Sequence, residues 1–268
     1  MNVTELKQLG MKHPRVAAAS ATVEELAEAV QRRMELMRAQ APAHSLRPSQ
    51  QLFLAESLSV LEPAMRHIRP PLHLPKAKNP RVVILMPGFG THPVRMRYMA
   101  ERLEEAGHTV KRWGAGFNMG ANPENFALVA QRVLDVSQRF GQPVMLVGWS
   151  LGGIFAREVA KLHPEAVARV ITMGSPFSHS PYSNNVWKLY QLITGYSVER
   201  PPLALDLAGK PPVETIALWS PRDGVVASRS AAGRPGERDR ARALRCSHMG
   251  FSNSPEAIRA VAEELDAE

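Results

Sequence analysis

A serine between glycines is the residue best placed for chemistry in this 268-residue sequence. The motif Gly148-Trp149-Ser150-Leu151-Gly152-Gly153 follows an aliphatic run and precedes a helical pattern, so it lies at a strand-to-helix turn. Such a turn projects the hydroxyl over the edge of a sheet, because the flanking glycines remove side chains that would clash there. A serine held in this way can attack a carbonyl carbon. A glycine-rich turn without chemistry is the alternative interpretation.

The sequence from Arg81 to the C-terminus resembles the α/β-hydrolase superfamily, and is most similar to compact bacterial lipase- and esterase-like members. Besides the serine motif, four blocks in the order of that superfamily carry the resemblance: Leu85-Met86-Pro87-Gly88-Phe89-Gly90, Met173-Gly174-Ser175-Pro176-Phe177, Ser220-Pro221-Arg222-Asp223-Gly224-Val225-Val226 and Ser247-His248-Met249-Gly250. The resemblance implies an α/β-hydrolase fold, with a mainly parallel central sheet flanked by helices, and cleavage of carboxylic esters.

An attacking serine needs a base, and the base needs an orienting carboxylate. The resemblance implies the chain order serine, acid, histidine. Of the histidines after Ser150, His163 is explained as a cation at a helix C-terminus, and His179 precedes any suitable acid. His248 lies in a short loop before the last helical segment, as the catalytic histidine of the superfamily does. We therefore assign the general base to His248.

Three aspartates lie between Ser150 and His248. Asp223 follows a strand-like segment and emerges at its carboxyl end, where open α/β sheets place their sites. Asp239 lies among arginines, which favours an ion pair with Arg238 or Arg240, and Asp206 lies in a region without strand character. We assign the acid to Asp223. A turn residue that caps the following segment is the alternative interpretation of Asp223.

Negative charge on a tetrahedral intermediate needs preorganised hydrogen-bond donors. The backbone N–H of Leu151 directly follows the serine and begins a helix, so it is the first predicted donor of an oxyanion hole. The resemblance implies that the second donor is the backbone N–H of Phe89. Gly88 and Gly90 permit the backbone path that this requires.

Aliphatic runs and helical patterns alternate from residue 81 onward, which predicts βαβ units and a mainly parallel sheet. The runs predicted as strands are residues 82–86, 108–113, 143–147, 167–173 and 215–219. The segments predicted as helices are residues 94–106, 125–140, 151–163 and 254–265, the first two ended by Gly107 and Gly141.

Residues 1–80 are predicted to form an N-terminal helical extension, and residues 81–268 the α/β-hydrolase domain. Residues 22–40 have apolar side chains at spacings of three and four and open with a capping box of Thr22 and Glu25, which predicts a helix. A second helix is predicted over residues 48–67, although Pro63 kinks or ends it. No chemistry is assigned to this extension.

Residues 178–212 leave the alternation of strands and helices and hold three of the four tyrosines. An insertion at this place in the superfamily commonly forms a cap over the nucleophile, so we interpret these residues as a short lid with an apolar acyl- or aryl-binding surface. Ordinary core packing of the same aromatic residues is the alternative. The residues assigned to the substrate pocket are Trp149, Phe177, Tyr182, Trp187 and Tyr190.

Cofactor and metal sites have little support in the sequence. The single cysteine, Cys246, excludes an intramolecular disulfide framework and a cysteine-rich metal site. Gly88-Phe89-Gly90 is followed by Pro93 where a dinucleotide-binding loop needs its third glycine. The histidines are scattered without the spacing of metal ligands. We therefore predict no cofactor and no metal.

The chain carries 33 basic and 25 acidic residues, a net charge of +8, which is typical of proteins that bind nucleic acid or anionic membranes. No dense basic run is interleaved with aromatic residues, as nucleic-acid binding would require. The predicted partner is a small-molecule or lipid ester, with weak attraction to anionic membrane surfaces and no nucleic acid. Six arginines between residues 229 and 245 are interpreted as a solvated, mobile face, or as a region that attracts an anionic substrate.

Three functions are consistent with these patterns. The leading one is serine-dependent hydrolysis of carboxylic esters through a Ser-His-Asp triad and a covalent acyl-enzyme. The others are acyl transfer to an acceptor other than water by the same triad, and binding without catalysis on the hydrolase fold. No stretch approaches the roughly 18 to 20 apolar residues of a membrane span, and residues 1–21 lack the apolar core of a secretory signal, so a cytoplasmic location is predicted. The sequence does not determine the physiological substrate or the oligomeric state.

Overall fold

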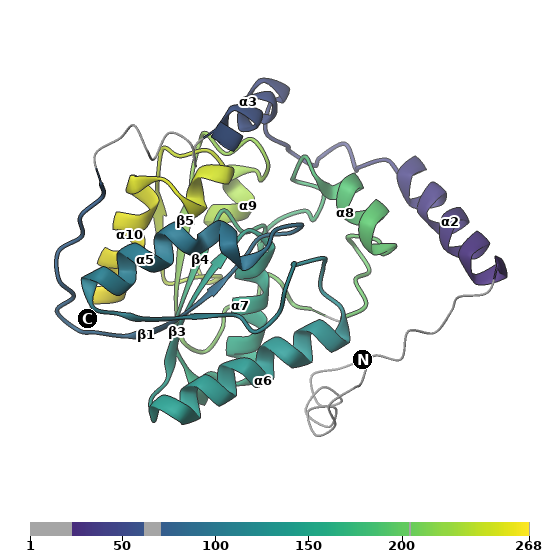
Figure 1. Cartoon of the computed structure of the whole chain (residues 1–268). Coiled ribbons are helices and arrows are strands. Elements are labelled where there is room, and N and C mark those ends of the chain that lie inside the picture. Colours follow the sequence, from purple (N-terminus) through teal and green to yellow (C-terminus); the bar gives the residue numbers. More distant parts are fainter. Residues whose placement is uncertain (1–22, 62–70, 204, 268) are drawn as a thin grey trace.

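A parallel β-sheet forms the centre of the molecule (Figure 1). The computed structural model describes residues 23–61, 71–203 and 205–267, and within them six strands pair in the order β2-β1-β3-β4-β5-β6, every pair parallel. The strands are β1 (Val82–Met86), β2 (Thr109–Arg112), β3 (Val144–Trp149), β4 (Val167–Met173), β5 (Glu214–Trp219) and β6 (Arg240–Ala243). This is the predicted α/β-hydrolase fold.

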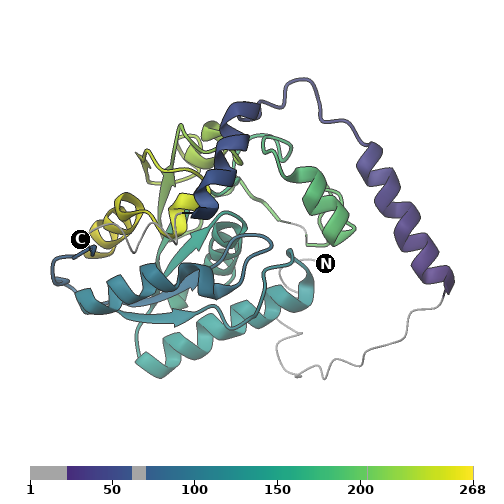
Figure 2. The same cartoon turned by 45° about the horizontal axis from the view of Figure 1, so that its top comes forward.

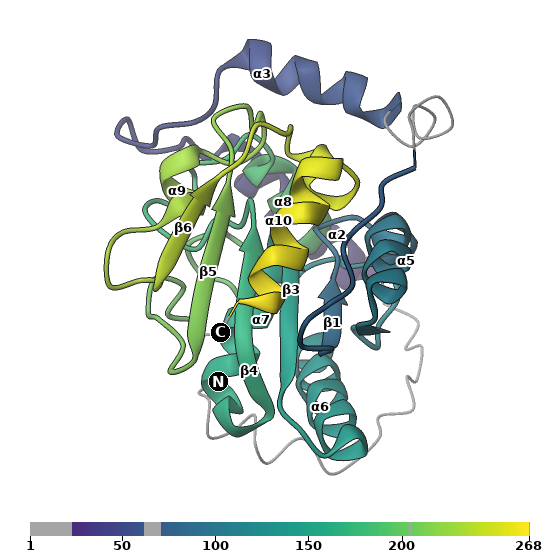
Figure 3. The same ribbon diagram turned by 90° about the vertical axis from the view of Figure 1, so that its left-hand side faces the viewer.

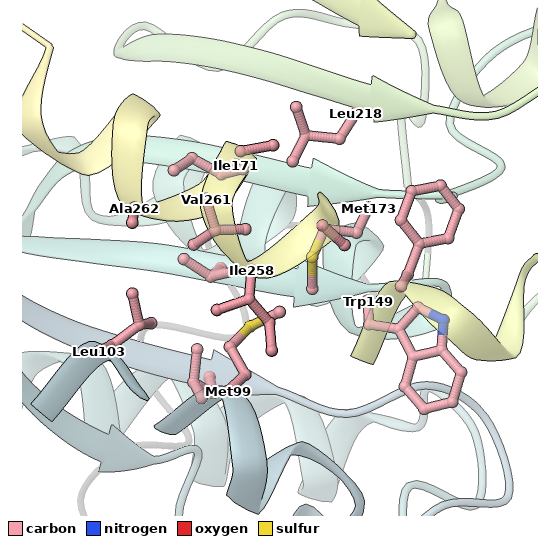
Figure 4. Packing of buried hydrophobic residues seen from close by; sticks show 14 of the residues in the cluster. Met99, Leu103, Trp149, Ile171, Met173, Leu218, Ile258, Val261 and Ala262 are labelled. Carbon is pink, nitrogen blue, oxygen red and sulfur yellow. The ribbon is translucent and has the colours of Figure 1, made fainter. Parts of the chain in front are cut away.

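Helices cover both faces of the sheet, because successive side chains of a strand point to opposite faces and both sets are apolar. Helices α5 (Arg97–Ala106) and α10 (Pro255–Asp266) cover one face, and α6 (Pro123–Phe140) and α7 (Leu151–Leu162) cover the other. Figure 4 shows the first of these layers. The labelled residues of this layer include Met99 and Leu103 of α5, Ile258 and Val261 of α10, and the strand residues Ile171, Met173 and Leu218.

Packing stabilises these helices more than their ends do. Ile258 and Val261 of α10 are fully buried, and burial of such a side chain contributes about 1.5 to 3 kcal/mol. The N-cap Ser254, which accepts a hydrogen bond from the N–H of Ala257, contributes about 1 kcal/mol. The predicted helix ends at Gly107 and Gly141 are confirmed, since both glycines cap their helices in the left-handed conformation.

The arginine-rich segment is largely exposed, as expected of a solvated face, and it has regular secondary structure. It contains the short helix α9 (Ser228–Ala232) and the sixth strand β6. Arg240 pairs with Glu214 at 3.0 Å and with Glu264 at 2.8 Å, and Arg242 pairs with Glu263 at 2.6 Å. The arginines therefore place their charge on an edge strand, where it opposes pairing with another sheet.

Asp239 does not pair with Arg238 or Arg240 as expected. Its carboxylate lies 3.0 Å from Lys210 and accepts a hydrogen bond from the N–H of Thr215 at 2.8 Å. The contact with Lys210 crosses from the segment before β5 to the segment before β6, which sequence spacing does not reveal.

The N-terminal extension contains α2 (Val23–Arg38), α3 (Gln50–Ala55) and the 3-10 helix η1 (Glu56–Leu61). The helix predicted over residues 48–67 begins at Gln50 and changes to a 3-10 helix at Glu56. Its last part, residues 62–67, and the capping residue Thr22 lie outside the described residues. Figure 2 shows α2 beside α8 (Trp187–Thr194), while Figure 3 shows α3 across the end of the sheet. The division at residue 80 and the lid over residues 178–212 stay predictions.

Helix α2 contacts α8 through polar groups rather than through its apolar stripe. The Arg33 guanidinium donates to the carbonyl of Leu192 at 3.0 Å, and the Gln191 amide donates to the carbonyl of Leu36 at 2.9 Å. The stripe itself faces solvent, with Leu26, Val30 and Met34 about half exposed. In the part of the chain that the structure describes, no helix combines the length and the apolarity needed to cross a bilayer.

Candidate active site

Ser150 lies on a strained turn between β3 and α7, with φ 54° and ψ −122°. A positive φ in a residue other than glycine costs about 1 to 3 kcal/mol, so the surrounding structure must impose it. A Cβ atom on Gly148 would lie 2.4 Å from the carbonyl oxygen of Gly152, and a Cβ atom on Gly152 would lie 2.2 Å from that of Met86. Only glycine fits at either position, as expected from the motif.

The serine also lies where the chain leaves the sheet in two directions. Strand β1 leads to α5 on one face, and the neighbouring β3 leads to α7 on the other face. Such a switch point opens a crevice at the carboxyl ends of the two strands. The loop after β1 borders this crevice, since a Cβ atom on Gly88 would lie only 3.2 Å from the Cβ of Ser150.

The structure brings Asp223 and His248 together at the same end of the sheet. Asp223 follows β5 and His248 follows β6, and the His248 Nδ1 atom lies 2.8 Å from Asp223 Oδ2. Both side chains are buried. The other carboxylate oxygen, Oδ1, accepts hydrogen bonds from the N–H groups of Val225 and Val226, each at 2.8 Å. The orientation of the carboxylate is therefore fixed on both of its oxygens.

Trp149 links His248 to the serine turn. The indole N–H of Trp149 donates to the carbonyl of His248 at 3.0 Å, and the two rings lie with centroids 5.9 Å apart. Because Trp149 directly precedes Ser150, this bond ties the histidine loop to the serine. Within the described residues Ser150 and His248 form no direct hydrogen bond, and such bonds in ligand-free enzymes often tighten only when substrate binds.

The surroundings of His248 change its affinity for a proton. Burial lowers the pKa of the imidazole, but the negative charges of Asp223 and Glu56 act in the opposite direction and hold the pKa above its ordinary value. A histidine of this kind accepts a proton more readily than one in solution. This suits a group that must take a proton from an attacking hydroxyl.

The two backbone N–H groups predicted as an oxyanion hole are those of Leu151 and Phe89. Within the described residues, neither the N–H of Leu151, at the start of α7, nor the N–H of Phe89 donates a hydrogen bond. The loop that carries Phe89 is held by Asn118, whose side chain donates to the carbonyl of Pro87 at 2.8 Å and whose carbonyl accepts from Gly90 at 2.7 Å. Asn118 is fully buried, and no local pattern in the sequence singles it out.

The five predicted pocket residues occupy different surroundings. The ring of Tyr190 packs against Phe89, with centroids 5.1 Å apart, so it is adjacent to the loop of the predicted oxyanion hole. Tyr182 and Trp187 are buried against each other, with ring centroids 5.0 Å apart. Trp149 is in the core beneath His248.

Phe177 is buried under the guanidinium of Arg157, which lies 4.1 Å from the ring centroid. The assignment of all five residues to a substrate pocket stays a prediction.

Exposed apolar side chains occur on two segments next to the loop of Phe89. Phe117 and Met119 are about half exposed or more on the segment that Asn118 ties to this loop, and Leu189 and Leu192 are similarly exposed on α8. A Cβ atom on Gly120 would lie 2.6 Å from the side chain of Thr194, which places α8 directly beside this segment.

A cavity of about 790 Å³ has Asp223 in its wall and is separate from the crevice at Ser150. Its walls come from the N-terminal segment 42–52 and from residues near 180 and 230. Asp223 lines it, but Ser150, His248 and the five predicted pocket residues do not. We assign the candidate chemistry to the crevice at Ser150 because that crevice holds the strained serine and the N–H groups of Phe89 and Leu151.

Glu56 of the N-terminal extension reaches the candidate site, which the sequence did not indicate. Its side chain is buried, and its carboxylate accepts hydrogen bonds from the backbone of Gly224, His248 and Met249. Contacts between residues this far apart in the chain leave no local signal, and the nearby pattern predicts only a helix.

Comparison with known proteins supports the α/β-hydrolase fold of the sheet domain. A family model described as the alpha/beta hydrolase fold matches residues 81–194. The mature form of the lipase BlEst2 from Bacillus licheniformis has a similar structure, with a TM-score of 0.55 and 16% identity over 74% of this chain and 96% of the lipase. The matched residues make up less than half of the chain, and the likeness to the lipase shows that the two proteins share the α/β-hydrolase fold.

Two curated esterases match short parts of the chain. The pimeloyl-[acyl-carrier protein] methyl ester esterase of Klebsiella pneumoniae (strain 342) is 43% identical over 68 residues, 25% of each chain. The enzyme of the same name from Edwardsiella ictaluri (strain 93-146) is 32% identical over 97 residues, 35% of this chain and 36% of the relative. The matches thus span about a quarter to a third of these relatives.

Proposed function

We propose that this chain is a serine hydrolase that cleaves carboxylic esters through Ser150, His248 and Asp223, by way of a covalent acyl-enzyme. One observation carries the proposal. A buried aspartate and histidine, joined at 2.8 Å, lie at the same end of the sheet as a serine held on a strained turn. The esterase names of the curated relatives support the same class of reaction.

Acylation of Ser150 is the first half of the proposed reaction. The neutral imidazole of His248 accepts the hydroxyl proton at Nε2 while Oγ attacks the ester carbonyl, and the Asp223 carboxylate stabilises the imidazolium through Nδ1–H. The N–H groups of Phe89 and Leu151 donate to the oxyanion of the tetrahedral intermediate. The imidazolium then gives its proton to the departing alcohol, and the acyl group stays on Oγ.

Hydrolysis of the acyl-enzyme repeats these steps with water. His248 takes a proton from the water, the hydroxide attacks the acyl carbon, and the same two N–H groups stabilise the second oxyanion. Collapse of the intermediate breaks the bond to Oγ and returns the proton from His248 to the serine. An alcohol in place of water makes the reaction an acyl transfer, so the choice of acceptor decides between the two enzyme classes.

Apolar side chains next to the loop of Phe89 support an ester with an apolar acyl group of medium or long chain. Phe117 and Met119 are exposed on the segment that Asn118 ties to this loop, and the ring of Tyr190 packs against Phe89. The relatives act, by their names, on a methyl ester of an acyl group carried by a protein. We include small-molecule and lipid esters in the proposed substrate class.

Labelling with a fluorophosphonate probe tests the proposed nucleophile. We expect one covalent adduct on Ser150 in the wild type and none in Ser150→Ala, while circular dichroism shows both to be folded. Folded wild type that takes no label contradicts the proposal. Turnover of nitrophenyl esters of increasing chain length, with and without an added alcohol, then separates hydrolysis from acyl transfer.

A further inference from the structure

The carboxylate of Glu56 bridges two loops that carry the proposed acid and base. Its Oε1 atom accepts from the N–H of Gly224 at 2.9 Å and from that of His248 at 2.6 Å, and its Oε2 atom accepts from the N–H of Met249 at 3.0 Å. Gly224 directly follows Asp223. Glu56 itself stands at the start of η1 and is only 6% exposed, which excludes water from these bonds.

Close packing holds the N-terminal segment that carries Glu56 against the same loops. A Cβ atom on Gly224 would lie 2.3 Å from the carbonyl oxygen of Leu52, so the backbone of α3 touches the acid loop directly. The side-chain amide of Asn185 donates to the carbonyls of both Pro48 and Gly224, at 3.1 and 2.8 Å. The segment from residue 48 to 61 is therefore seated on the acid loop by several independent contacts.

The geometry of the proposed acid and base depends on the spacing of these two loops. Asp223 and His248 come from separate loops with α9 and β6 between them, and their side chains must meet at hydrogen-bond distance. A buried carboxylate that accepts N–H groups from both loops fixes that spacing, and hydrogen bonds to a charged group are about twice as strong as neutral ones.

We propose that Glu56 is a positioning residue that holds the loop of Asp223 and the loop of His248 together for proton transfer. The N-terminal segment 48–61 is then a part of the active site rather than an appended helix. This inference rests on the proposed function for its catalytic meaning, but the clamp itself is open to measurement without turnover.

The charge of Glu56 gives the clamp a signature that simple packing lacks. Two charged groups act on His248: Asp223, from the loop after β5, and Glu56, from η1; the rings of Trp149 and Phe251 cover the imidazole without charge. Both negative charges raise the pKa of His248, against the effect of burial. Loss of the Glu56 charge must therefore lower that pKa, whereas a loss of packing alone need not.

The test compares Glu56→Gln with the wild-type full chain. Glutamine has one acceptor oxygen in place of two, so at least one N–H of the two loops loses its partner. NMR of the 15N-labelled chain would follow amide exchange at Gly224, His248 and Met249, and a titration would follow the His248 imidazole, assigned from its absence in His248→Gln. We expect amide exchange at least about tenfold faster, and a lower pKa of His248.

Glu256→Gln is a matched control. Both oxygens of Glu256 accept from the N–H of Arg245, at 3.1 and 3.0 Å, so this carboxylate also holds the chain between β6 and His248. It does not touch Asp223 or His248, and we expect wild-type exchange at Gly224 and a wild-type His248 titration. Glu56→Asp keeps the charge on a shorter side chain, so it should restore the pKa more than the amide protection. Glu56→Asp also replaces Glu56→Gln as the test variant if Glu56→Gln fails to fold.

Turnover adds the catalytic part of the inference. We expect Glu56→Gln to lower kcat for a nitrophenyl ester by about tenfold, with little change in KM and an acidic limb of the pH profile moved to lower pH. Wild-type amide exchange, His248 titration and kcat in Glu56→Gln would overturn the inference. A wild type without Ser150 labelling instead overturns the proposed function, and the NMR measurements still decide whether Glu56 holds the loops.

Discussion

The two halves of the candidate active site are held in different ways. The serine turn is held by close backbone packing: Gly148 lets β3 approach the start of α7, and Gly152 lets α7 approach the end of β1. The acid and histidine come from separate loops and are joined by polar contacts, with Glu56 reaching them from the N-terminal extension. A local turn can be recognised from its letters, but an assembled pair depends on the whole fold.

The largest expected effect comes from the assembled half. Asp223→Asn removes the charge that orients His248, and kcat for an ester should fall by about 10⁴-fold, as loss of a triad acid does elsewhere. Asp239→Asn is the matched control, because Asp239 also follows β5 and accepts a backbone N–H but lies away from His248. Its kcat should stay within about fivefold of the wild type. Equal losses in both variants contradict the assignment of the acid.

A substitution in the serine turn should instead act by lowering the stability of the fold. A Cβ atom on Gly148 would be only 2.4 Å from a backbone oxygen, so Gly148→Ala should lower the free energy of unfolding by about 2 kcal/mol or more. A Cβ atom on Gly116 would meet nothing within 4 Å, so Gly116→Ala is the control. It should change the free energy of unfolding by less than about 1 kcal/mol. Urea denaturation measures both. A Gly148→Ala variant as stable as wild type would show that the turn tolerates a side chain.

The same contrast explains what the sequence could predict. The strands β1 and β4 occur at the expected residues because buried parallel strands are continuous aliphatic runs, and Ser150 lies on its turn because glycines enforce it. Strand β6 was missed, since four alternating arginines and alanines lack an apolar face. Asn118 and Glu56 were missed because their partners lie far along the chain, and only the assembled fold brings them together.

The smallest expected effect is a shift in pH dependence. Burial lowers the pKa of His248, and Asp223 and Glu56 more than offset this, so the pKa lies above the ordinary value of about 6.5. The base acts only when neutral, so kcat/KM should rise with pH through a midpoint above 6.5. A midpoint at or below 6.5 in the wild type would contradict the claim that Asp223 and Glu56 raise the pKa of His248.

The rate of fluorophosphonate addition to Ser150 tests the central claim most directly, because it needs the serine turn and the acid–histidine pair at once. Intact-mass measurements at pH 7 should show rapid single labelling of the wild type and of Glu256→Gln, none in Ser150→Ala, and markedly slower labelling in Asp223→Asn. Folded wild type without label, or Asp223→Asn labelled as fast as wild type, would contradict the account.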